Sequence, residues 1–283
     1  MRSSRWVLPL AAHLGIAGTA HPQFEALAGS SALEDQIAFA ADQGFSGVSD
    51  NGLLGRSRDE RRRMASALAR RELAFGSLTQ HRPGERPIAW AAPGVEFAPQ
   101  LGEALEAALF MRARSVTIVV LDEGLEPAVQ WEACLSSLSR AADLASTRGV
   151  VLCVEPASRE RVPGVLIEHM ADALALVSAV GNHALKVVAD TCHLALVGDD
   201  PAVGIQNAAP QLGGVQVADV PGRVEPGAGD LDFSSITSAI QAARWSGLVE
   251  AEFFASREGI DGERAVLAAL DIAFGHRFEK ENL

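Results

Sequence analysis

The sequence predicts a single (β/α)₈ barrel over residues 1–283, and three observations support this fold class. The chain of 283 residues is close to the ~250 residues of one such barrel and long enough to bury a large core. Eight short apolar runs alternate with longer amphipathic stretches, which is the pattern of parallel strands joined by crossover helices. An open doubly wound sheet is the alternative, but residues 15–18 (GIAG), after the first run, lack the GxGxxG spacing typical of it.

The expected strands are short runs rich in Val, Ile and Leu, as in strands that are buried on both faces. They cover residues 7–14, 45–49, 73–78, 115–121, 149–155, 185–190, 213–219 and 247–253. Amphipathic helices are expected at residues 33–44, 130–149, 169–181, 232–247 and 261–274. Gly44 is a predicted C-cap of the first of these helices, and Ser234 and Ser235 are predicted N-caps of the fourth.

Two further stretches have a predicted structural role. The basic run at residues 56–63 is mixed with Asp59 and Glu60, which favours a solvated helix face over a nucleic-acid patch. Residues 80–100 are rich in Pro and Gly and form a long connection after the third strand. An active-site lid would lie at this position of a barrel, so we expect that role for them.

The composition limits the binding partners and the cellular compartment that can be expected for the protein. A net charge of −12 opposes binding to nucleic acid or to anionic membranes. The sequence contains no uninterrupted apolar run of ~18 residues, so we predict no transmembrane helix. Three cysteines, an odd number without zinc-site spacing, favour a reducing compartment, so we expect a cytoplasmic protein. Residues 2–20 also allow a secretory signal, but His13 interrupts their apolar run and favours a first strand instead.

Oxygen-bearing side chains lie in or at the end of each of the last four predicted strands. They are Glu155, Asp190, Gln216 and Glu252, separated by 35, 26 and 36 residues, each close to one strand–helix unit. The carboxyl ends of barrel strands meet at one face, so we expect these side chains to point to a common place. Any one of them alone would be more typical of a helix cap or an arginine partner. Three carboxylates and one amide oxygen together are hard donors that suit Mg²⁺ or Mn²⁺.

Four other polar residues lie near these donors in the sequence. Glu250 is two residues before the last donor and shares its strand face, so we expect an interior group there. His193 is either a hydrogen-bond donor to a substrate oxygen or a solvated loop residue. Arg223 and Glu225 lie in the glycine-rich residues 221–233, where an arginine can hold a substrate carboxylate bidentately or form a surface salt bridge.

Four segments of the second half resemble the hydroxypyruvate isomerase family, a branch of the xylose-isomerase-like TIM barrel superfamily. They are VEPAS (154–158), VADTCH (188–193), GGVQVADVPGRVEPGAGDLDF (213–233) and SGLVEAEF (246–253). The divalent-metal ligands that the resemblance implies are Glu155, Asp190, Gln216 and Glu252. The resemblance further implies Glu155 and Glu252 as the catalytic acid–base pair. Substrate would be bound by His193, Arg223 and Glu225.

The activity that the resemblance implies is a metal-dependent interconversion of aldose and ketose forms, as from hydroxypyruvate to tartronate semialdehyde, through an enediolate. Mg²⁺ or Mn²⁺ would be the cofactor and a small sugar acid the substrate. Whether the chain forms a homo-oligomer is left open. A 2-oxo-tetronate isomerase and a ketose 3-epimerase of the same superfamily are alternatives. From another class, the alternative is a barrel that binds a sugar acid without turnover. The acidic charge opposes a DNA-repair endonuclease.

Three departures from the family pattern concern the substrate. Ser49 stands at the end of the second strand, where the family usually has a glutamate. Val224 stands where a histidine or another polar residue is common, and the loop near residues 80–90 keeps only residues 84–86 of the pattern. All three fall where substrate would be recognised, so they put the substrate in doubt more than the metal site.

Overall fold

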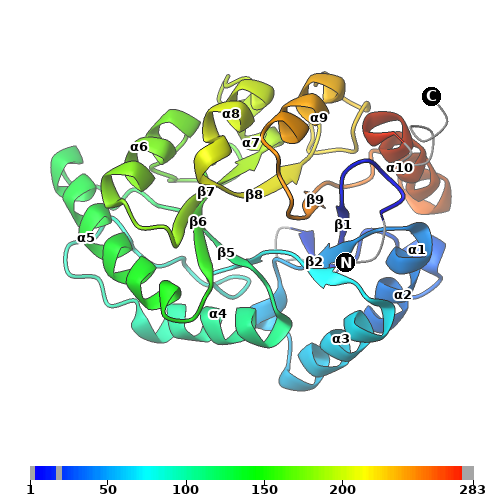
Figure 1. Ribbon diagram of the computed structural model, residues 1–283, viewed down its shortest axis with the longest axis horizontal. Helices are drawn as coiled ribbons and strands as arrows, with labels where there is room; N and C mark the ends of the chain where they lie inside the picture. The colour runs from blue at the N-terminus through cyan, green and yellow to red at the C-terminus, as the bar shows by residue number, and fades with distance from the viewer. Residues whose placement is uncertain (1–3, 17–20, 276–283) are drawn as a thin grey trace.

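The computed structural model describes residues 4–16 and 21–275, and it has the parallel barrel that the sequence predicts (Figure 1). Residues 17–20, within the stretch that also allows a secretory signal, lie outside the described part of the chain. The helices form a ring around the strands. This layering is expected when crossover helices cover the outer face of a closed parallel sheet.

The strands form one ring. They are β1 (Leu10–His13), β2 (Gly47–Ser49), β3 (Ala74–Phe75), β4 (Leu78–Thr79), β5 (Ser115–Ile118), β6 (Val151–Val154), β7 (Leu185–Asp190), β8 (Leu212–Val217) and β9 (Val249–Ala251). Hydrogen bonding follows the order β3-β2-β1-β9-β8-β7-β6-β5-β4, with every neighbouring pair parallel. β3 and β4 are two parts of the third predicted strand, separated by Gly76 and Ser77. The two ends of the sheet are therefore one chain segment, which closes the barrel.

The five predicted helices are present, with ends shifted by several residues. The α-helices are α1 (Glu25–Ala28), α2 (Leu33–Gln43), α3 (Arg58–Arg71), α4 (Ala98–Met111), α5 (Pro127–Ser146), α6 (Met170–Val180), α7 (Thr191–Leu196), α8 (Pro201–Ala208), α9 (Phe233–Ala242) and α10 (Gly259–Phe274). Short 3₁₀ turns lie at η2 (Leu53–Gly55) and η3 (Ala209–Gln211). The pattern did not predict α4 or α8, which complete the outer layer.

The helix caps confirm one prediction and correct another. Gly44 ends α2 with a φ of 88°, a left-handed conformation that glycine adopts without steric cost. The N-cap of α9 is Asp232, so the prediction of Ser234 and Ser235 as caps was wrong. The Asp232 carboxylate accepts from the backbone N–H groups of both serines, at 3.0 and 3.3 Å, which satisfies two otherwise free donors of the first turn.

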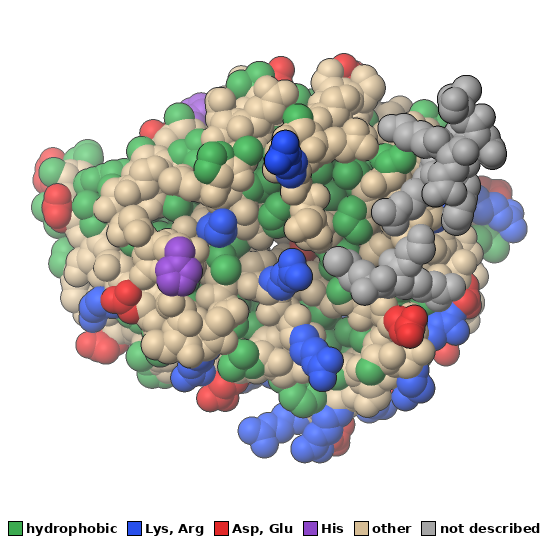
Figure 2. Space-filling model, viewed as in Figure 1, with side chains coloured by type: hydrophobic (Ala, Val, Ile, Leu, Met, Phe, Trp, Pro, Cys, Tyr) green, Lys and Arg blue, Asp and Glu red, His purple; other side chains and the backbone are tan. Residues whose placement is uncertain are grey.

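The basic run at residues 56–63 is a solvated helix face, as predicted. Ser57 caps α3 in a capping box with Glu60, while Arg62 and Arg63 pair with acidic neighbours at 3.1 and 2.7 Å. Met64 on the opposite side is buried. On the face seen in Figure 2, basic and acidic side chains are interspersed around the rim.

Residues 80–100 are packed against the barrel along much of their length. Trp90 is fully buried, and its indole N–H donates to Gln80 Oε1 at 2.8 Å. The Trp90 carbonyl accepts from Ser137 Oγ of α5 at 2.7 Å. The segment is thus anchored near its middle, and the part that lies over the barrel mouth is the shorter stretch of residues 81–87.

The structure describes two features that the composition drew attention to, the cysteines and the apolar character of the helices. Cys134, Cys153 and Cys192 are all free thiols and are buried. Among the residues that the structure describes, no helix combines the length and the apolar character needed to cross a bilayer.

Candidate active site

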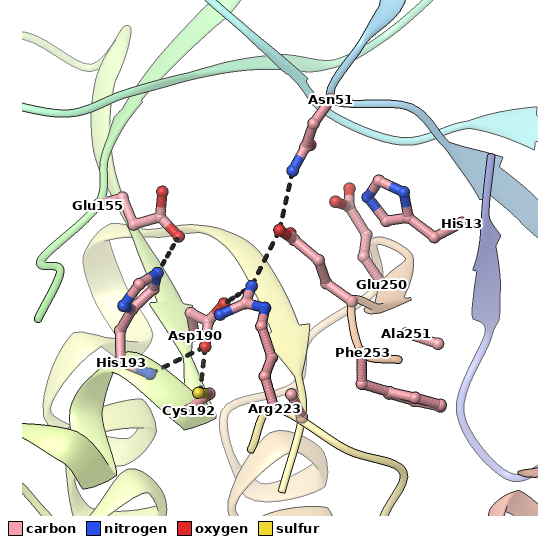
Figure 3. Close-up of polar contacts among 12 residues, drawn as sticks. His13, Asn51, Glu155, Asp190, Cys192, His193, Arg223, Glu250, Ala251 and Phe253 are labelled. Atoms are coloured by element: carbon pink, nitrogen blue, oxygen red, sulfur yellow. Dashed lines mark hydrogen bonds and ion pairs between the residues drawn. The ribbon is translucent and has the colours of Figure 1, made fainter. Parts of the chain in front are cut away.

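The four oxygen-bearing side chains lie at the carboxyl ends of four consecutive strands. We call Glu155, Asp190, Gln216 and Glu252 the four-donor set. Glu155 follows β6, Asp190 ends β7, Gln216 lies near the end of β8 and Glu252 follows β9. Asp190 and Gln216 are directly paired in the β7–β8 register, and all four residues are at most 9% exposed. The sheet therefore brings these side chains to one buried end of the barrel, where Figure 3 shows Glu155 and Asp190.

Asp190 is fixed by both its backbone and its arginine neighbour. Its Oδ1 accepts from the backbone N–H groups of Cys192 and His193, at 2.8 and 3.0 Å, because it caps α7. Its Oδ2 accepts from Arg223 Nη2 at 2.6 Å. Burial alone would raise the pKa of Asp190, but the Arg223 charge and these hydrogen bonds outweigh burial and lower it. Asp190 is therefore ionised and rigidly held.

The surroundings of Glu155 strongly disturb its protonation. Burial, followed by the charges of Asp190 and Glu252, raises the pKa of Glu155 well above its ordinary value. Glu155, Asp190 and His193 each offer a ligand atom, and these atoms lie within 4.8 Å of one another. This arrangement leaves a surplus of negative charge that a bound cation would relieve.

His193 has a defined tautomer. Its Nδ1 accepts from the backbone N–H of Ser158 at 3.2 Å, so the ring proton lies on Nε2. Burial lowers the pKa of His193 and keeps the ring neutral. Nε2 is 3.9 Å from Glu155 Oε1, so the Nε2 side of the ring is turned toward that carboxylate (Figure 3).

Glu252 has one occupied and one free oxygen. Its Oε1 accepts from Asn51 Nδ2 at 2.8 Å and forms an ion pair with Arg223 Nη2 at 2.9 Å. Its Oε2 is buried and has no hydrogen-bond partner among the described residues. Burial raises the pKa of Glu252. Asn51, which follows β2, is a site residue that the sequence analysis missed, because no periodic pattern marks a loop asparagine.

Arg223 and Glu225 are separated by the fold although they are close in sequence. Arg223 is 5% exposed, has a left-handed φ of 59° and bridges Asp190 and Glu252. Glu225 is turned to the loop after β9, where its two oxygens accept from the N–H and Oγ of Ser256, at 2.7 and 2.6 Å. Glu225 is therefore not brought to the pocket with the other predicted residues.

Glu250 forms an inner layer beneath the four-donor set, as expected of an interior group. Its carboxylate accepts from the Ser77 N–H and Oγ, at 2.6 and 2.8 Å. Burial raises the pKa of Glu250 to about 7, and hydrogen bonding from Ser77 and Gln216 partly offsets that rise. A carboxylate only accepts, so Gln216 presents its NH₂ to Glu250. The Gln216 Oε1 is then left buried without a partner in the described part of the chain.

Ser49 and Gly76 also belong to this inner layer. A Cβ built on Gly76 would lie 2.3 Å from Ser49 Oγ and 2.5 Å from Glu250 Oε1, so the backbone must pass closely there. Ser49, Glu250 and Ser77 thus fill the barrel interior below the site.

A pocket of about 650 Å³ opens above these residues. Its polar lining includes Glu155, His193, Arg223 and Glu252. The lining also includes a largely apolar group that consists of Pro83, Pro87, Val119, Leu121, Val162, Pro163 and Phe254. This combination of a few convergent polar groups and apolar walls is typical of a site for a small organic molecule.

Three known proteins are similar to this chain. A 2-oxo-tetronate isomerase from Cupriavidus necator is 30% identical over 204 residues, which are 67% of this chain and 77% of that protein. The hydroxypyruvate isomerase of Escherichia coli is 28% identical over 177 residues, which are 60% of this chain and 67% of that protein. A crystal structure described as an AP endonuclease, family 2, from Brucella melitensis matches with a TM-score of 0.76 at 25% identity, and the match covers 95% of this chain and 97% of that one.

A family model also matches most of the chain. The model of the xylose isomerase-like TIM barrel family matches residues 37–273, which include every strand from β2 to β9 and the whole four-donor set. The chain belongs to the xylose isomerase-like TIM barrel family.

Proposed function

We propose that this chain is a divalent-metal-dependent isomerase of a small hydroxy-carbonyl acid, with hydroxypyruvate as the reference substrate. The observation that supports the proposal is a buried cluster in which Glu155 lies near Asp190 and Arg223 joins Asp190 to Glu252. Asp190 and Glu252 form ion pairs with the same nitrogen of Arg223, at 2.6 and 2.9 Å, and Glu155 offers a ligand atom within 4.8 Å of one from Asp190. The relatives named as 2-oxo-tetronate isomerase and hydroxypyruvate isomerase support an isomerase of this superfamily.

The chemistry of the four-donor set fits a hard cation. Three carboxylates face one arginine in a buried space, and the free oxygens of Gln216 and Glu252 have no partner among the described residues. The four-donor set would hold Mg²⁺ or Mn²⁺, for which oxygen ligands are preferred. When bound, the cation would act as a Lewis acid that stabilises negative charge on substrate oxygens.

Glu155 and Glu252 supply the proton transfer in this proposal. Both line the pocket, and burial raises the pKa of each, which strengthens them as bases. One carboxylate removes a proton from the carbon beside the carbonyl and leaves an enediolate. The other carboxylate, or the same one, returns a proton to the adjacent carbon.

His193 and Arg223 prepare the site for this transfer. The neutral imidazole holds its proton on Nε2, so it donates to a substrate oxygen without competing for the proton on carbon. Arg223 holds Asp190 and Glu252 in place by its two ion pairs. Because both its partners are protein carboxylates, its proposed contact with substrate is secondary to this positioning.

A substrate panel in D₂O tests the proposal. Hydroxypyruvate, 2-oxo-tetronates and ketoses would each be incubated with Mg²⁺ or Mn²⁺ and followed by proton NMR. The proposal predicts that solvent deuterium enters a substrate C–H bond and that the carbonyl moves in an acid substrate. Inversion of one carbon of a ketose would instead assign a 3-epimerase. No deuterium uptake across the panel would exclude turnover and favour a barrel that only binds a sugar acid.

The geometry gives that non-catalytic alternative little support. Ser49 and Val224, which depart from the family pattern, do not line the pocket and so do not favour this alternative. Val224 is held in backbone bridges with Asp219 and Phe254, and Ser49 lies beside Glu250. A nucleic-acid substrate is also disfavoured, because the net charge is −12 and the candidate metal group in the described residues contains a single histidine.

A further inference from the structure

Two arginines line the pocket, and their surroundings differ sharply. Arg223 is neutralised by Asp190 and Glu252. The Arg161 side chain forms no ion pair and no hydrogen bond with any residue that the structure describes, and its Nε is buried without a partner. A half-buried guanidinium with unused donors is costly unless a ligand satisfies it. The pocket therefore contains one unneutralised positive group.

The loop that carries Arg161 is well anchored. It joins β6 to α6, and the backbone N–H groups of Arg161 and Val162 donate to the Ser158 carbonyl at 3.1 and 2.8 Å. Leu166 donates to the Val120 carbonyl at 2.8 Å, and Val165 bridges to Leu121 beyond the end of β5. This loop is also the one whose Ser158 fixes the His193 tautomer. The guanidinium is thus held over the same pocket as the candidate acid–base pair.

The immediate surroundings of Arg161 strengthen the electrostatic attraction between its guanidinium and an anion. Its pocket neighbours Val162 and Pro163 are apolar, so water screens the guanidinium less than at an open surface.

We propose that Arg161 binds the carboxylate of the substrate and thereby selects acids over neutral sugars of the same length. The inference rests on the proposed function, because it takes the substrate to be a hydroxy-carbonyl acid. It moves the predicted role of carboxylate anchor from Arg223, whose charge is already neutralised, to Arg161. A guanidinium suits this role, since its parallel N–H donors match the two oxygens of a carboxylate.

The test uses binding of an unreactive acid and does not require turnover. D-erythronate, a four-carbon acid without a ketone, would be titrated calorimetrically into the full-length protein with Mn²⁺ present, beside neutral erythritol. The inference predicts that Arg161→Met raises the Kd for erythronate by about 10- to 100-fold, which is the loss expected for a charge-assisted contact. Arg161→Lys should lose less, and erythritol binding should change by less than about 2-fold.

Arg159→Met is the matched control. Arg159 lies on the same loop, but its guanidinium is 60% exposed and pairs with Glu168 at 3.1 Å outside the pocket. This variant should bind erythronate like the unaltered protein. Thermal unfolding of both variants would verify that the fold is intact.

The possible outcomes distinguish the role of Arg161 in carboxylate binding from the proposed isomerase activity. Equal loss of erythronate and erythritol binding in Arg161→Met, or no loss of either, would overturn the anchor. Arg161→Met could also turn over with deuterium uptake and an unchanged KM for the acid. That result would overturn the role of Arg161 as carboxylate anchor but would agree with the proposed isomerase activity. Selective loss of acid binding supports the anchor even if no substrate of the panel exchanges deuterium.

Discussion

The two halves of the barrel contribute different parts of the candidate site. The second half, from β6 to β9, supplies the four-donor set at or near its strand ends. The first half, from β1 to β5, supplies groups that shape and support this set. Asn51 holds Glu252, Ser77 holds Glu250, and Val119 and Leu121 form part of the pocket wall. We therefore expect substitutions in the second half to lower the rate of the reaction. Substitutions in the first half should instead alter the positions of the site residues and the recognition of substrate.

The largest effect is expected from Glu155→Gln and Glu252→Gln in the second half. Each removes a proposed proton-transfer group while keeping its size, so kcat should fall by about 10²- to 10⁴-fold. Steady-state kinetics on the best substrate of the panel would measure the loss. Glu168→Gln, which changes a surface carboxylate paired with Arg159, is the control. Near-normal turnover in both site variants would remove the acid–base assignment.

A smaller effect is expected from Glu250→Gln, beneath the four-donor set. Glu250 accepts the Gln216 NH₂ and so leaves Gln216 Oε1 free for a cation. A glutamine at position 250 can donate as well as accept, so the Gln216 amide is no longer oriented. Affinity for Mn²⁺, measured by electron paramagnetic resonance, should fall by about 10- to 100-fold, as for other groups that orient a metal ligand. Unchanged Mn²⁺ affinity would show that Glu250 does not position Gln216.

Gly76→Ala tests the close packing of the first half. The added methyl group would meet Ser49 Oγ and Glu250 Oε1 at 2.3 and 2.5 Å, so the barrel interior must shift. The free energy of unfolding should fall by about 1–3 kcal/mol, as for other overpacked cores. Urea unfolding would measure it. Gly102→Ala in α4 has open space around it and should be neutral or stabilising by up to about 1 kcal/mol. Equal stability changes in the two variants would contradict the packing argument.

Asn51→Ala is expected to have the smallest effect of these changes. It removes one hydrogen bond to Glu252, worth about 0.5–1.5 kcal/mol, so kcat/KM should fall by about 2- to 10-fold. Asn182→Ala, which removes an exposed hydrogen bond to Asp143, should leave kcat/KM unchanged. A loss of about 1,000-fold in Asn51→Ala would instead give the first half a direct part in the chemistry.

The barrel was predictable from the sequence because its strands are buried on both faces. Runs such as residues 115–121 and 185–190 are mostly apolar, and they became β5 and β7. α4 was hidden by the Pro- and Gly-rich residues that precede it, although Pro99 is well tolerated in its first turn. The Ser234 and Ser235 caps were misassigned because Asp232 reaches both of their N–H groups.

The candidate site was predictable where strand geometry determines side-chain position. The spacing of the four-donor set follows the strand–helix repeat, so its convergence could be expected. Loop residues follow no such period. Arg161 and Asn51 were missed for this reason, and Glu225 points to Ser256 because the loop after β8 is held by its own backbone bridge between Asp219 and Val224.

The most direct test of the account is a crystal structure of the protein with Mn²⁺, recorded at a wavelength where manganese scatters anomalously. One strong anomalous peak is expected within coordination distance of oxygens from Glu155, Asp190, Gln216 and Glu252. A peak bound by other residues, or four side chains that point apart around an empty space at saturating Mn²⁺, would contradict it.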